Sequence, residues 1–350
     1  MIKVLIVDDS AFMRNAISGM LASDPEIEVI GTARDGLEAL EKVSSLRPDI
    51  VTMDIEMPRM DGLTALKQIM AKSPVPVIMI SSLTSEGAKA TLDALEYGAV
   101  DFIPKNLSDL SVNIMKIREI LINKVKQITQ KKLVSPKTRS QAPQTIPETS
   151  HSISPMPATA RRMGIVSIGT STGGPKALHA ILPHMPKDFP VPIIIAQHMP
   201  PAFTGPFAER LNQICKISVK EAEEGEPIRP GVALIAPGRG HMRVRRQRAI
   251  ETVVTISENR DEFIYRPSVD ALMFSVAECF PGRALGIILT GMGNDGLKGL
   301  TALKKTGGRI FAQNEETCVV YGMPKAVVDA GIADKVLPIE EMAGEIINAV

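Results

Sequence analysis

The chain of 350 residues contains two blocks in which short runs of Val, Ile, Leu and Met alternate with longer amphipathic segments. The first block covers residues 1–122 and the second covers residues 162–350. Each apolar run has the length of a buried strand, and each segment between runs has the length of a helix. Because successive β/α units build parallel sheets covered by helices, each block predicts a doubly wound α/β domain with functional groups at the carboxyl ends of its strands.

The expected strands alternate with helical segments throughout both blocks. In the first block they lie at residues 3–7, 28–33, 49–54, 75–81 and 100–104. In the second block they lie at residues 164–170, 191–197, 231–236, 284–290 and 308–313. Residues 241–257 alternate polar and apolar side chains in two runs, which predicts an inserted β-hairpin. Residues 123–161 are rich in Lys, Gln, Ser and Thr, contain five prolines and show no apolar period, so they predict a flexible linker.

The bulk composition excludes several classes of protein. The 40 basic and 39 acidic residues leave a net charge of +1, so no general attraction to nucleic acid or to an anionic membrane is expected. The longest apolar runs are of strand length, which predicts no insertion into a membrane. The three cysteines are widely separated, which argues against a disulfide framework or a zinc site and favours a reduced, cytoplasmic protein.

Charged and polar side chains end the strands of the first block. Asp8 and Asp9 follow the first strand, Asp54 ends the third, Ser81 ends the fourth and Lys105 follows the fifth. Three converging carboxylates repel one another unless a cation holds them, and Mg²⁺ suits oxygen ligands. The Lys ammonium and the Ser hydroxyl can stabilise the oxygens of a transferred phosphoryl group. The pattern therefore predicts a phosphoacceptor site with Asp54 as the acceptor.

Four segments carry a resemblance to a known family: VLIVDDS, DIVTMDIEMPRMDGLTAL, VIMISS and AVDFIPK. They resemble the receiver domain of two-component response regulators over nearly all of the first block. The resemblance implies a flavodoxin-like fold in which Asp54 accepts phosphate from a histidine kinase. It also implies that Mg²⁺ is bound by Asp9, Asp54 and the backbone carbonyl of Glu56, with Asp8 acting through water.

The receiver resemblance also assigns a switch and shows one departure. By this resemblance, Ser81 and Phe102 would occupy the switch positions. Lys105 is followed by Asn106, whereas receivers commonly have Pro after this Lys. An X–Pro bond adopts the cis form at small cost and a Lys–Asn bond does not, so the geometry of this loop stays open although the Lys charge remains.

In the second block, GTSTGGPK at residues 169–176 directly follows an apolar run. Gly169 and Gly174 have the spacing of a phosphate-binding P-loop, but Pro175 stands where that loop needs Lys. The same letters also spell the G-x-S-x-G turn that presents a nucleophilic serine, here Ser171, above a parallel sheet. We favour the nucleophile, since Pro175 is harmless at the start of the following helix.

A nucleophilic serine needs a base and an acid that orients the base. His198 ends the next apolar strand and is favoured as the base, with His241 as the alternative. Asp295, in the Gly-rich loop GMGNDG, is favoured as the acid over Asp270. The same loop makes Met292 a candidate oxyanion donor through its backbone. The order Ser, His, acid differs from the order in the α/β-hydrolase fold, which the second domain is therefore not expected to adopt.

The segments IGTSTGGP, IIIAQHMP, APGRGH, RPSVDALM and ILTGMGNDG carry a second resemblance. They resemble the catalytic domain of chemotaxis response-regulator methylesterases across the second block, and the order receiver, linker, esterase also matches that family. The resemblance implies that Ser171 is the nucleophile, His198 its base and Asp295 the orienting acid. Thr172 and Met292 would line the site.

The second resemblance implies hydrolysis of glutamyl methyl esters, and deamidation of glutamines, on chemoreceptor helices, with no cofactor for hydrolysis. The expected partners are methylated chemoreceptors as substrate and a histidine kinase as phosphodonor. We also expect the unphosphorylated receiver to cover the serine cleft. The alternative functions are a signalling adaptor, a transcription regulator and a nucleotide-binding enzyme. Against the transcription regulator, we interpret the arginines of the hairpin as its solvated face, without a role in DNA binding. These are Arg243, Arg245, Arg246 and Arg248.

Overall fold

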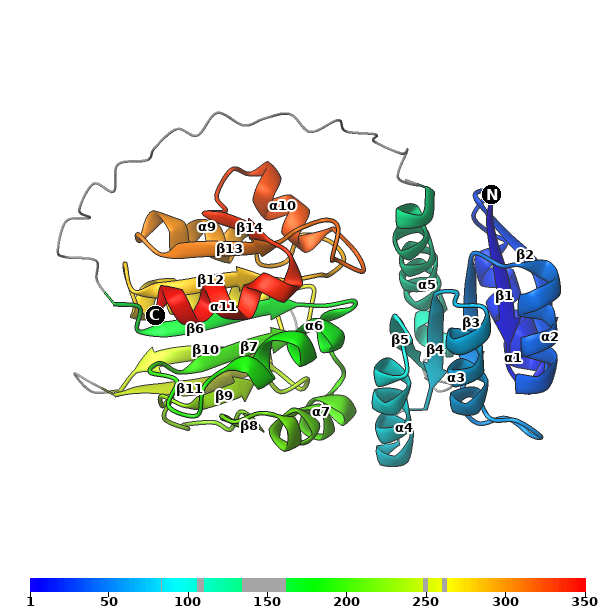
Figure 1. The fold of residues 1–350 in the computed structure, drawn as a ribbon, viewed down its shortest axis with the longest axis horizontal. Helices are drawn as coiled ribbons and strands as arrows, with labels where there is room; N and C mark the ends of the chain where they lie inside the picture. The colour runs from blue at the N-terminus through cyan, green and yellow to red at the C-terminus, as the bar shows by residue number, and fades with distance from the viewer. Residues whose placement is uncertain (83, 106–109, 134–161, 248–250, 260–262) are drawn as a thin grey trace, which may run out of the picture.

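The computed structural model describes residues 1–82, 84–105, 110–133, 162–247, 251–259 and 263–350, which form two α/β domains (Figure 1). The N-terminal domain has a five-stranded sheet in the order β2-β1-β3-β4-β5, and every pair is parallel. Its strands are β1 (Ile2–Val7), β2 (Ile27–Ala33), β3 (Ile50–Asp54), β4 (Val77–Ser81) and β5 (Asp101–Pro104). Its helices are α1 (Ala11–Leu21), α2 (Gly36–Leu46), α3 (Gly62–Lys72), α4 (Ser85–Glu96) and α5 (Leu110–Leu133). This strand order confirms the flavodoxin-like doubly wound fold.

The C-terminal domain has a seven-stranded parallel sheet in the order β14-β13-β12-β6-β7-β9-β8. Its strands are β6 (Ile165–Thr170), β7 (Ile193–Gln197), β8 (Ser218–Glu221), β9 (Val232–Ile235), β12 (Ala284–Ile288), β13 (Arg309–Gln313) and β14 (Lys335–Leu337). An antiparallel hairpin joins β10 (His241–Arg246) to β11 (Thr252–Ser257), as expected. The predicted parallel sheet with a hairpin insertion is therefore confirmed. The edge strands β8 and β14 escape prediction because they are short and partly polar.

Helices cover both faces of the second sheet (Figure 1). They are α6 (Gly174–Ile181), the 3₁₀ turn η1 (Leu182–His184), α7 (Pro201–Ile214), α8 (Val269–Cys279), α9 (Leu297–Lys305), α10 (Met323–Asp329) and α11 (Ile339–Ala349). The central strand β6 is buried along its whole length, as a strand covered on both faces must be. Among the described residues, no helix is both long and apolar enough to span a lipid bilayer.

The last helix of the N-terminal domain continues beyond the expected boundary at residue 122. Helix α5 runs to Leu133, and its later turns bury Leu121, Val125 and Ile128 against the core of that domain. These apolar residues recur at helical spacing, but the Lys and Gln residues between them disguise the period in the sequence. The rest of the expected linker, residues 134–161, lies outside the described residues.

The two domains contact each other through α4, β5 and α5 on one side and α6, α7 and the loop after β13 on the other (Figure 1). The ring of Phe102 in β5 stacks on that of Phe203 in α7, with centroids 4.5 Å apart. Arg210 of α7 pairs with Asp93 and, at 3.2 Å, with Glu96 of α4. This contact reaches the carboxyl edge of the second sheet, where the candidate nucleophile lies.

Candidate functional sites

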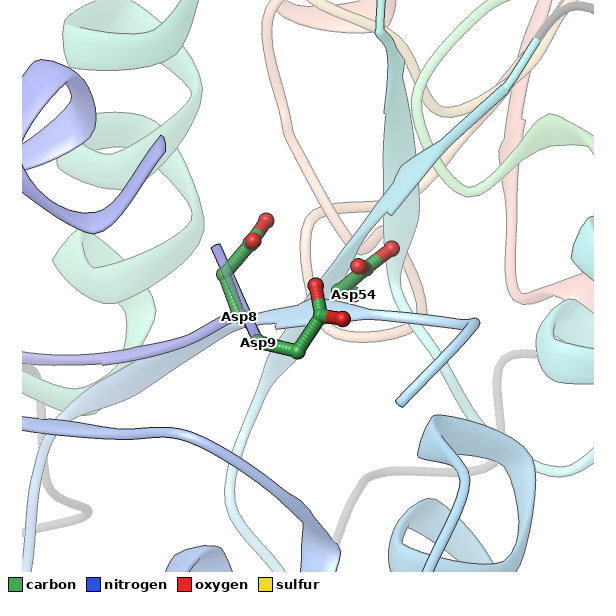
Figure 2. Close-up of side chains that lie close together, drawn as sticks. All are labelled: Asp8, Asp9 and Asp54. Atoms are coloured by element: carbon green, nitrogen blue, oxygen red, sulfur yellow. The ribbon is translucent and has the colours of Figure 1, made fainter. Parts of the chain in front are cut away.

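Asp8, Asp9 and Asp54 meet at the carboxyl edge of the first sheet (Figure 2). Each offers a carboxylate oxygen, and the three oxygens lie within 4.8 Å of one another. The carboxyl groups of Asp8 and Asp54 are buried, whereas Asp9 is exposed. Parallel strands place these side chains together because β1 and β3 are neighbours and end at the same level.

Lys105 partly neutralises this cluster. Its Nζ lies 2.9 Å from Asp8 Oδ2 and 2.6 Å from Asp54 Oδ2. Burial raises the pKa of Asp54 to about 6, since the lowering effect of Lys105 does not compensate and the charge of Asp8 adds to the rise. Burial acts to lower the pKa of Lys105, but its bonds to Asp54 and Asp8 outweigh this and the pKa is raised. The cluster therefore holds more negative charge than one ammonium balances.

The oxygen cluster fits a divalent cation. The three carboxylate oxygens lie close enough together to bind one Mg²⁺ ion, and Asp9 is open to solvent. Mg²⁺ prefers oxygen ligands of this kind and keeps some of its bound waters. Glu56 lies two residues after Asp54 in the same loop, with its side chain exposed. Asn106, which follows Lys105, lies outside the described residues.

The two residues expected at switch positions face different neighbours. The Ser81 hydroxyl is fully buried and accepts a hydrogen bond of 2.5 Å from Thr91 of α4. Phe102 lies on the next strand and stacks on Phe203 of the C-terminal domain. Ser81 therefore connects β4 to α4, and Phe102 connects β5 to the other domain.

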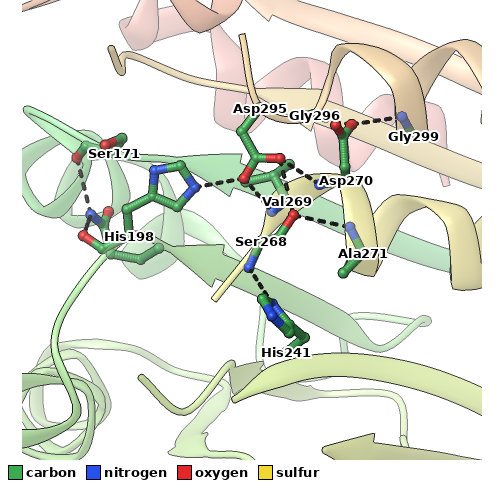
Figure 3. A network of polar contacts seen from close by, with 11 residues as sticks. Ser171, His198, His241, Ser268, Val269, Asp270, Ala271, Asp295, Gly296 and Gly299 are labelled. Carbon is green, nitrogen blue, oxygen red and sulfur yellow. Dashed lines mark hydrogen bonds and ion pairs between the residues drawn. The ribbon is translucent and has the colours of Figure 1, made fainter. Parts of the chain in front are cut away.

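Ser171 and His198 follow neighbouring strands of the second sheet (Figure 3). Thr170 pairs with Gln197 at the ends of β6 and β7, and the His198 N–H donates to the Thr170 carbonyl at 3.1 Å. The neighbouring position of β7 was expected from its place in the chain, and the strand order confirms it. The Gln197 side chain also donates to the carbonyls of Ser171, at 3.0 Å, and His198, at 3.1 Å, which ties the two turns together.

The turn that carries Ser171 is built by its glycines. Gly173 has a φ of 78°, and a Cβ there would come within 2.6 Å of Val319. The Gly174 N–H donates to the Ser171 carbonyl at 2.8 Å, which closes the turn as α6 begins. Pro175 lies in the first turn of α6, where no backbone donor is needed. The sharp turn leaves the Ser171 side chain half-buried at the sheet edge.

Asp295 is the most densely bonded carboxylate of this site (Figure 3). Its Oδ2 lies 2.8 Å from His198 Nε2 and accepts the Val269 N–H at 2.7 Å. Its Oδ1 accepts the Ser268 hydroxyl and the Asp270 N–H, both at 3.0 Å. Burial acts to raise the pKa of Asp295, but the His198 contact and the backbone donors outweigh it and the pKa is lowered. Asp295 is thus held as a carboxylate.

The His198 ring lies between Ser171 and Asp295 in Figure 3. Because Nε2 faces Asp295, Nδ1 is the nitrogen left for the serine; it is buried and makes no hydrogen bond to another described residue. Catalytic contacts of this kind often tighten only when substrate binds. The Tyr265 ring stacks on the imidazole at 4.5 Å with an interplanar angle of 6°, which fixes the plane of the ring.

His241 and Asp270, the alternative candidates for the base and the acid, contact the segments around Asp295. His241 Nδ1 accepts the Ser268 N–H at 3.2 Å, in a fully buried position. Asp270 Oδ1 accepts the N–H groups of Gly296, at 3.0 Å, and Gly299, at 2.7 Å, at the start of α9. Both residues therefore support the segments that carry Ser268 and Asp295, and neither contacts Ser171.

The two residues expected to line the site lie at the domain contact. The Thr172 hydroxyl, next to Ser171, donates to the carboxylate of Asp101 in β5, which also pairs with Lys124 of α5. Met292 packs against an apolar cluster formed mainly by the N-terminal domain. The N-terminal domain thus covers the immediate surroundings of Ser171.

Four residues in these networks were absent from the sequence-based predictions: Gln197, Ser268, Tyr265 and Asp101. Gln197 ends an apolar strand, so its polar side chain was a detectable signal at the sheet edge. Ser268 is the N-cap of α8, and nothing in the sequence connects it to Asp295. Tyr265 and Asp101 act through partners distant in sequence, and no local pattern indicates them.

Comparison with known proteins agrees with both halves of this description. Residues 4–114 match the family model described as response regulator receiver domain, and residues 166–346 match CheB methylesterase. A protein-glutamate methylesterase/protein-glutamine glutaminase of Oleidesulfovibrio alaskensis is 52% identical, with all of both chains covered. One from Pyrococcus horikoshii is 46% identical, covering 100% of this chain and 94% of the relative. The crystal structure of the Thermotoga maritima CheB methylesterase catalytic domain covers 54% of this chain and 99% of its own, at 43% identity and a TM-score of 0.52.

Proposed function

This chain belongs to the CheB methylesterase family, and we propose that it hydrolyses glutamyl methyl esters and deamidates glutamines on chemoreceptors through Ser171, His198 and Asp295. The observation that carries this proposal is the position of the His198 ring, bonded to Asp295 on one side and next to the Ser171 turn on the other. An imidazole held in this way can accept a proton from a serine hydroxyl.

In the proposed reaction, Ser171 Oγ attacks the carbonyl carbon of the glutamyl side chain while His198 takes the hydroxyl proton. The tetrahedral oxyanion collapses, His198 gives its proton to the leaving group, and methanol or ammonia departs from an acyl-enzyme. Water then attacks the acyl carbon as His198 takes one of its protons, and the returned proton restores the serine. Asp295 remains a carboxylate throughout and stabilises the imidazolium. The backbone N–H of Met292 is the proposed oxyanion donor.

We infer that Asp54 is phosphorylated by a histidine kinase. Asp9, Asp54 and the Glu56 carbonyl would bind Mg²⁺, with Asp8 acting through water, and the metal would supply positive charge to the cluster and the phosphoryl oxygens. Lys105 contributes a second positive charge from within the cluster. The exposed side of Asp9 leaves a route for a phosphodonor.

We further infer that the domain contact restrains the esterase. Asp101 holds Thr172, the residue next to the nucleophile, and Phe102 anchors β5 to α7. A phosphorylated Asp54 relieves this restraint only if phosphate favours a separated arrangement over the docked one. Phe102 and Ser81 occupy the strands between Asp54 and the contact, so a rearrangement there would weaken docking.

Covalent labelling of the full chain by a fluorophosphonate tests the catalytic assignment. We expect the label on the peptide that contains Ser171, at a rate that rises when a small phosphodonor is added. Both Ser171→Ala and His198→Ala should lose the label, because the first removes the nucleophile and the second its base. Labelling of another serine, or unchanged labelling of His198→Ala, would contradict the proposed mechanism.

A further inference from the structure

A groove of about 660 Å³ lies between the β10–β11 hairpin and α8, and none of its lining residues belongs to the Ser171, His198 and Asp295 site. The lining residues that the structure describes combine guanidinium groups with aromatic rings and include one carboxylate. These lining residues include Arg243, Arg245, Arg246, Phe263, Phe274 and Glu278. None of them has a role in the proposed ester hydrolysis.

The arginines of the groove differ in their freedom to bind a partner. Arg246 donates to the Cys279 carbonyl at 2.7 Å and so closes the end of α8. Arg243 lies over the Phe263 ring, 5.9 Å from its centroid. Arg245 is exposed and makes no hydrogen bond or ion pair with another described residue. Glu278 is the one carboxylate among the described residues that line the groove, and the exposed guanidinium of Arg245 gives this part of the groove a positive charge that suits carboxylates.

Strand β10 and helix α8, which wall the groove, both start next to the esterase site. Strand β10 and helix α8 run in the same direction, joined by His241 and Ser268 next to the site, by Val244 and Ser275 in the middle, and by Arg246 and Cys279 at the far end. From the start of α8, where its backbone contacts Asp295, to its end is roughly 15 Å at the helical rise.

One short segment connects the groove to the catalytic imidazole. The Phe263 ring packs edge-on against His241 at 5.3 Å, and Tyr265, two residues later, stacks on His198. Ile264 between them is 90% exposed, which leaves an apolar side chain between the groove and the site. Residues 263–265 therefore span from the groove to the catalytic imidazole.

We propose that this groove binds an acidic segment of the chemoreceptor that flanks the glutamyl ester under attack; this inference rests on the proposed function. On a helical substrate, a span of roughly 15 Å corresponds to about ten residues, so the carboxylates that meet Arg245 lie two to three turns from the ester. Esterification neutralises the target side chain, and the flanking carboxylates keep the charge that the arginines recognise.

A protein segment fits this groove better than a small anion does. Phe274, 40% exposed, and Arg245 form an open lip, whereas sites for small ligands bury most of the ligand surface. An exposed apolar ring next to a cation matches the surface of an amphipathic acidic helix. Charges at such a rim act mainly on encounter and on salt dependence, so we expect them to affect KM and leave the chemical step unchanged.

The test compares two substrates of the full, phosphodonor-treated chain. We expect Arg245→Glu to raise KM for membranes bearing methylated chemoreceptor by roughly five- to tenfold, an effect that shrinks as salt rises. Hydrolysis of p-nitrophenyl acetate, which is too small to reach the groove, should remain within about twofold of wild type. Lys216→Glu, which reverses an exposed charge between α7 and β8, is the matched control and should leave both reactions unchanged.

The outcomes separate this inference from the function on which it rests. An unchanged KM in Arg245→Glu, or an equal rise in Lys216→Glu, overturns the docking groove. Competition by a nucleotide at micromolar concentration, with the receptor KM unaffected by charge reversal, would assign the groove to a small anion and overturn it as well. If the wild-type chain hydrolyses the small ester but no receptor ester, the proposed substrate itself is wrong.

Discussion

Asp54 and Asp295 are both buried carboxylates at the carboxyl edge of a parallel sheet, yet their surroundings move their pKa values in opposite directions. Asp54 has one backbone donor, the Ile55 N–H at 2.7 Å, and shares Lys105 with a second carboxylate. Asp295 has two backbone donors, a hydroxyl and an imidazole. The pKa of Asp54 is raised to about 6 and that of Asp295 is lowered.

The difference lies in how many fixed donors each carboxylate receives. Asp54 ends a strand beside other acids, so its negative charge is incompletely compensated and favours a bound cation. Asp295 lies in a loop folded over the start of α8, whose N–H groups point at it. The edge of a parallel sheet therefore holds one carboxyl with a raised pKa and one with a lowered pKa, according to the donors around each.

Of the substitutions that test this comparison, Asp295→Asn should change the rate of ester hydrolysis most. An amide cannot accept the same set of donors or stabilise an imidazolium, so we expect ester hydrolysis to fall on the order of 10³- to 10⁴-fold. Because the pKa of Asp295 is lowered on folding, its charge stabilises the folded state above the ordinary aspartate pKa of 3.8, and that stabilisation is lost as pH falls below it. The variant should therefore also unfold at a lower temperature at neutral pH.

Asp188→Asn is the control for this change, since Asp188 is exposed on the same domain. Its hydrolysis rate and unfolding temperature should match those of wild type. A rate for Asp295→Asn within about tenfold of wild type would show that Asp295 does not orient His198.

An intermediate effect is expected for the domain contact. Asp101→Ala removes the acceptor that holds Thr172, and a charge-assisted hydrogen bond of this type contributes about 1.5–3 kcal/mol. We expect ester hydrolysis without a phosphodonor to rise about tenfold, and phosphorylation to add little more. The measurement is the initial rate with and without a phosphodonor.

Asp24→Ala is the matched variant, because Asp24 also pairs with a lysine of α5, Lys126, at 3.2 Å, but away from the other domain. It should keep the low resting rate and the full response to phosphodonor. Equal activation of the two variants would mean that loosening α5, and not releasing Thr172, raises the rate.

The smallest expected effect is a shift in the pH at which the Asp54 carboxyl loses its proton. We expect a carbon NMR titration of the metal-free chain to show a midpoint of about 6 for this carboxyl, moving to lower pH when Mg²⁺ is added. Because the folded-state pKa lies above the ordinary aspartate pKa of 3.8, the folded state binds more protons in this window, and the associated stability is lost as pH rises through about 6. A metal-free midpoint close to the ordinary aspartate pKa would remove the contrast with Asp295.

Much of the fold follows from the sequence because parallel sheets obey strong rules. Strand-length apolar runs locate β1, β3, β6 and β7, and the tendency of successive units to be neighbours places His198 beside Ser171. The end of α5 was not predicted, since Lys and Gln residues hide the spacing of Leu121, Val125 and Ile128.

The donors of Asp295 could not be predicted, because Ser268 and Val269 reach it from more than 25 positions earlier in the chain. The same is true of Asp101, whose partner Thr172 is 71 positions away in the other domain. Contacts of this kind depend on how preformed units pack, and no local pattern encodes that packing.

If the domain contact restrains the esterase as proposed, the bond between Asp101 and Thr172 affects how much ester is hydrolysed without phosphorylation. If docking favours the closed form by about 2 kcal/mol, roughly one molecule in thirty is open without any stimulus. A stronger contact would lower the open fraction without phosphate, but phosphorylation would then have to supply more free energy to open the protein. A weaker contact would leave so many molecules open that phosphorylation changes the rate little. In the proposed restraint, the bond between Asp101 and Thr172 is therefore one of the contacts whose strength determines how far hydrolysis can rise on phosphorylation.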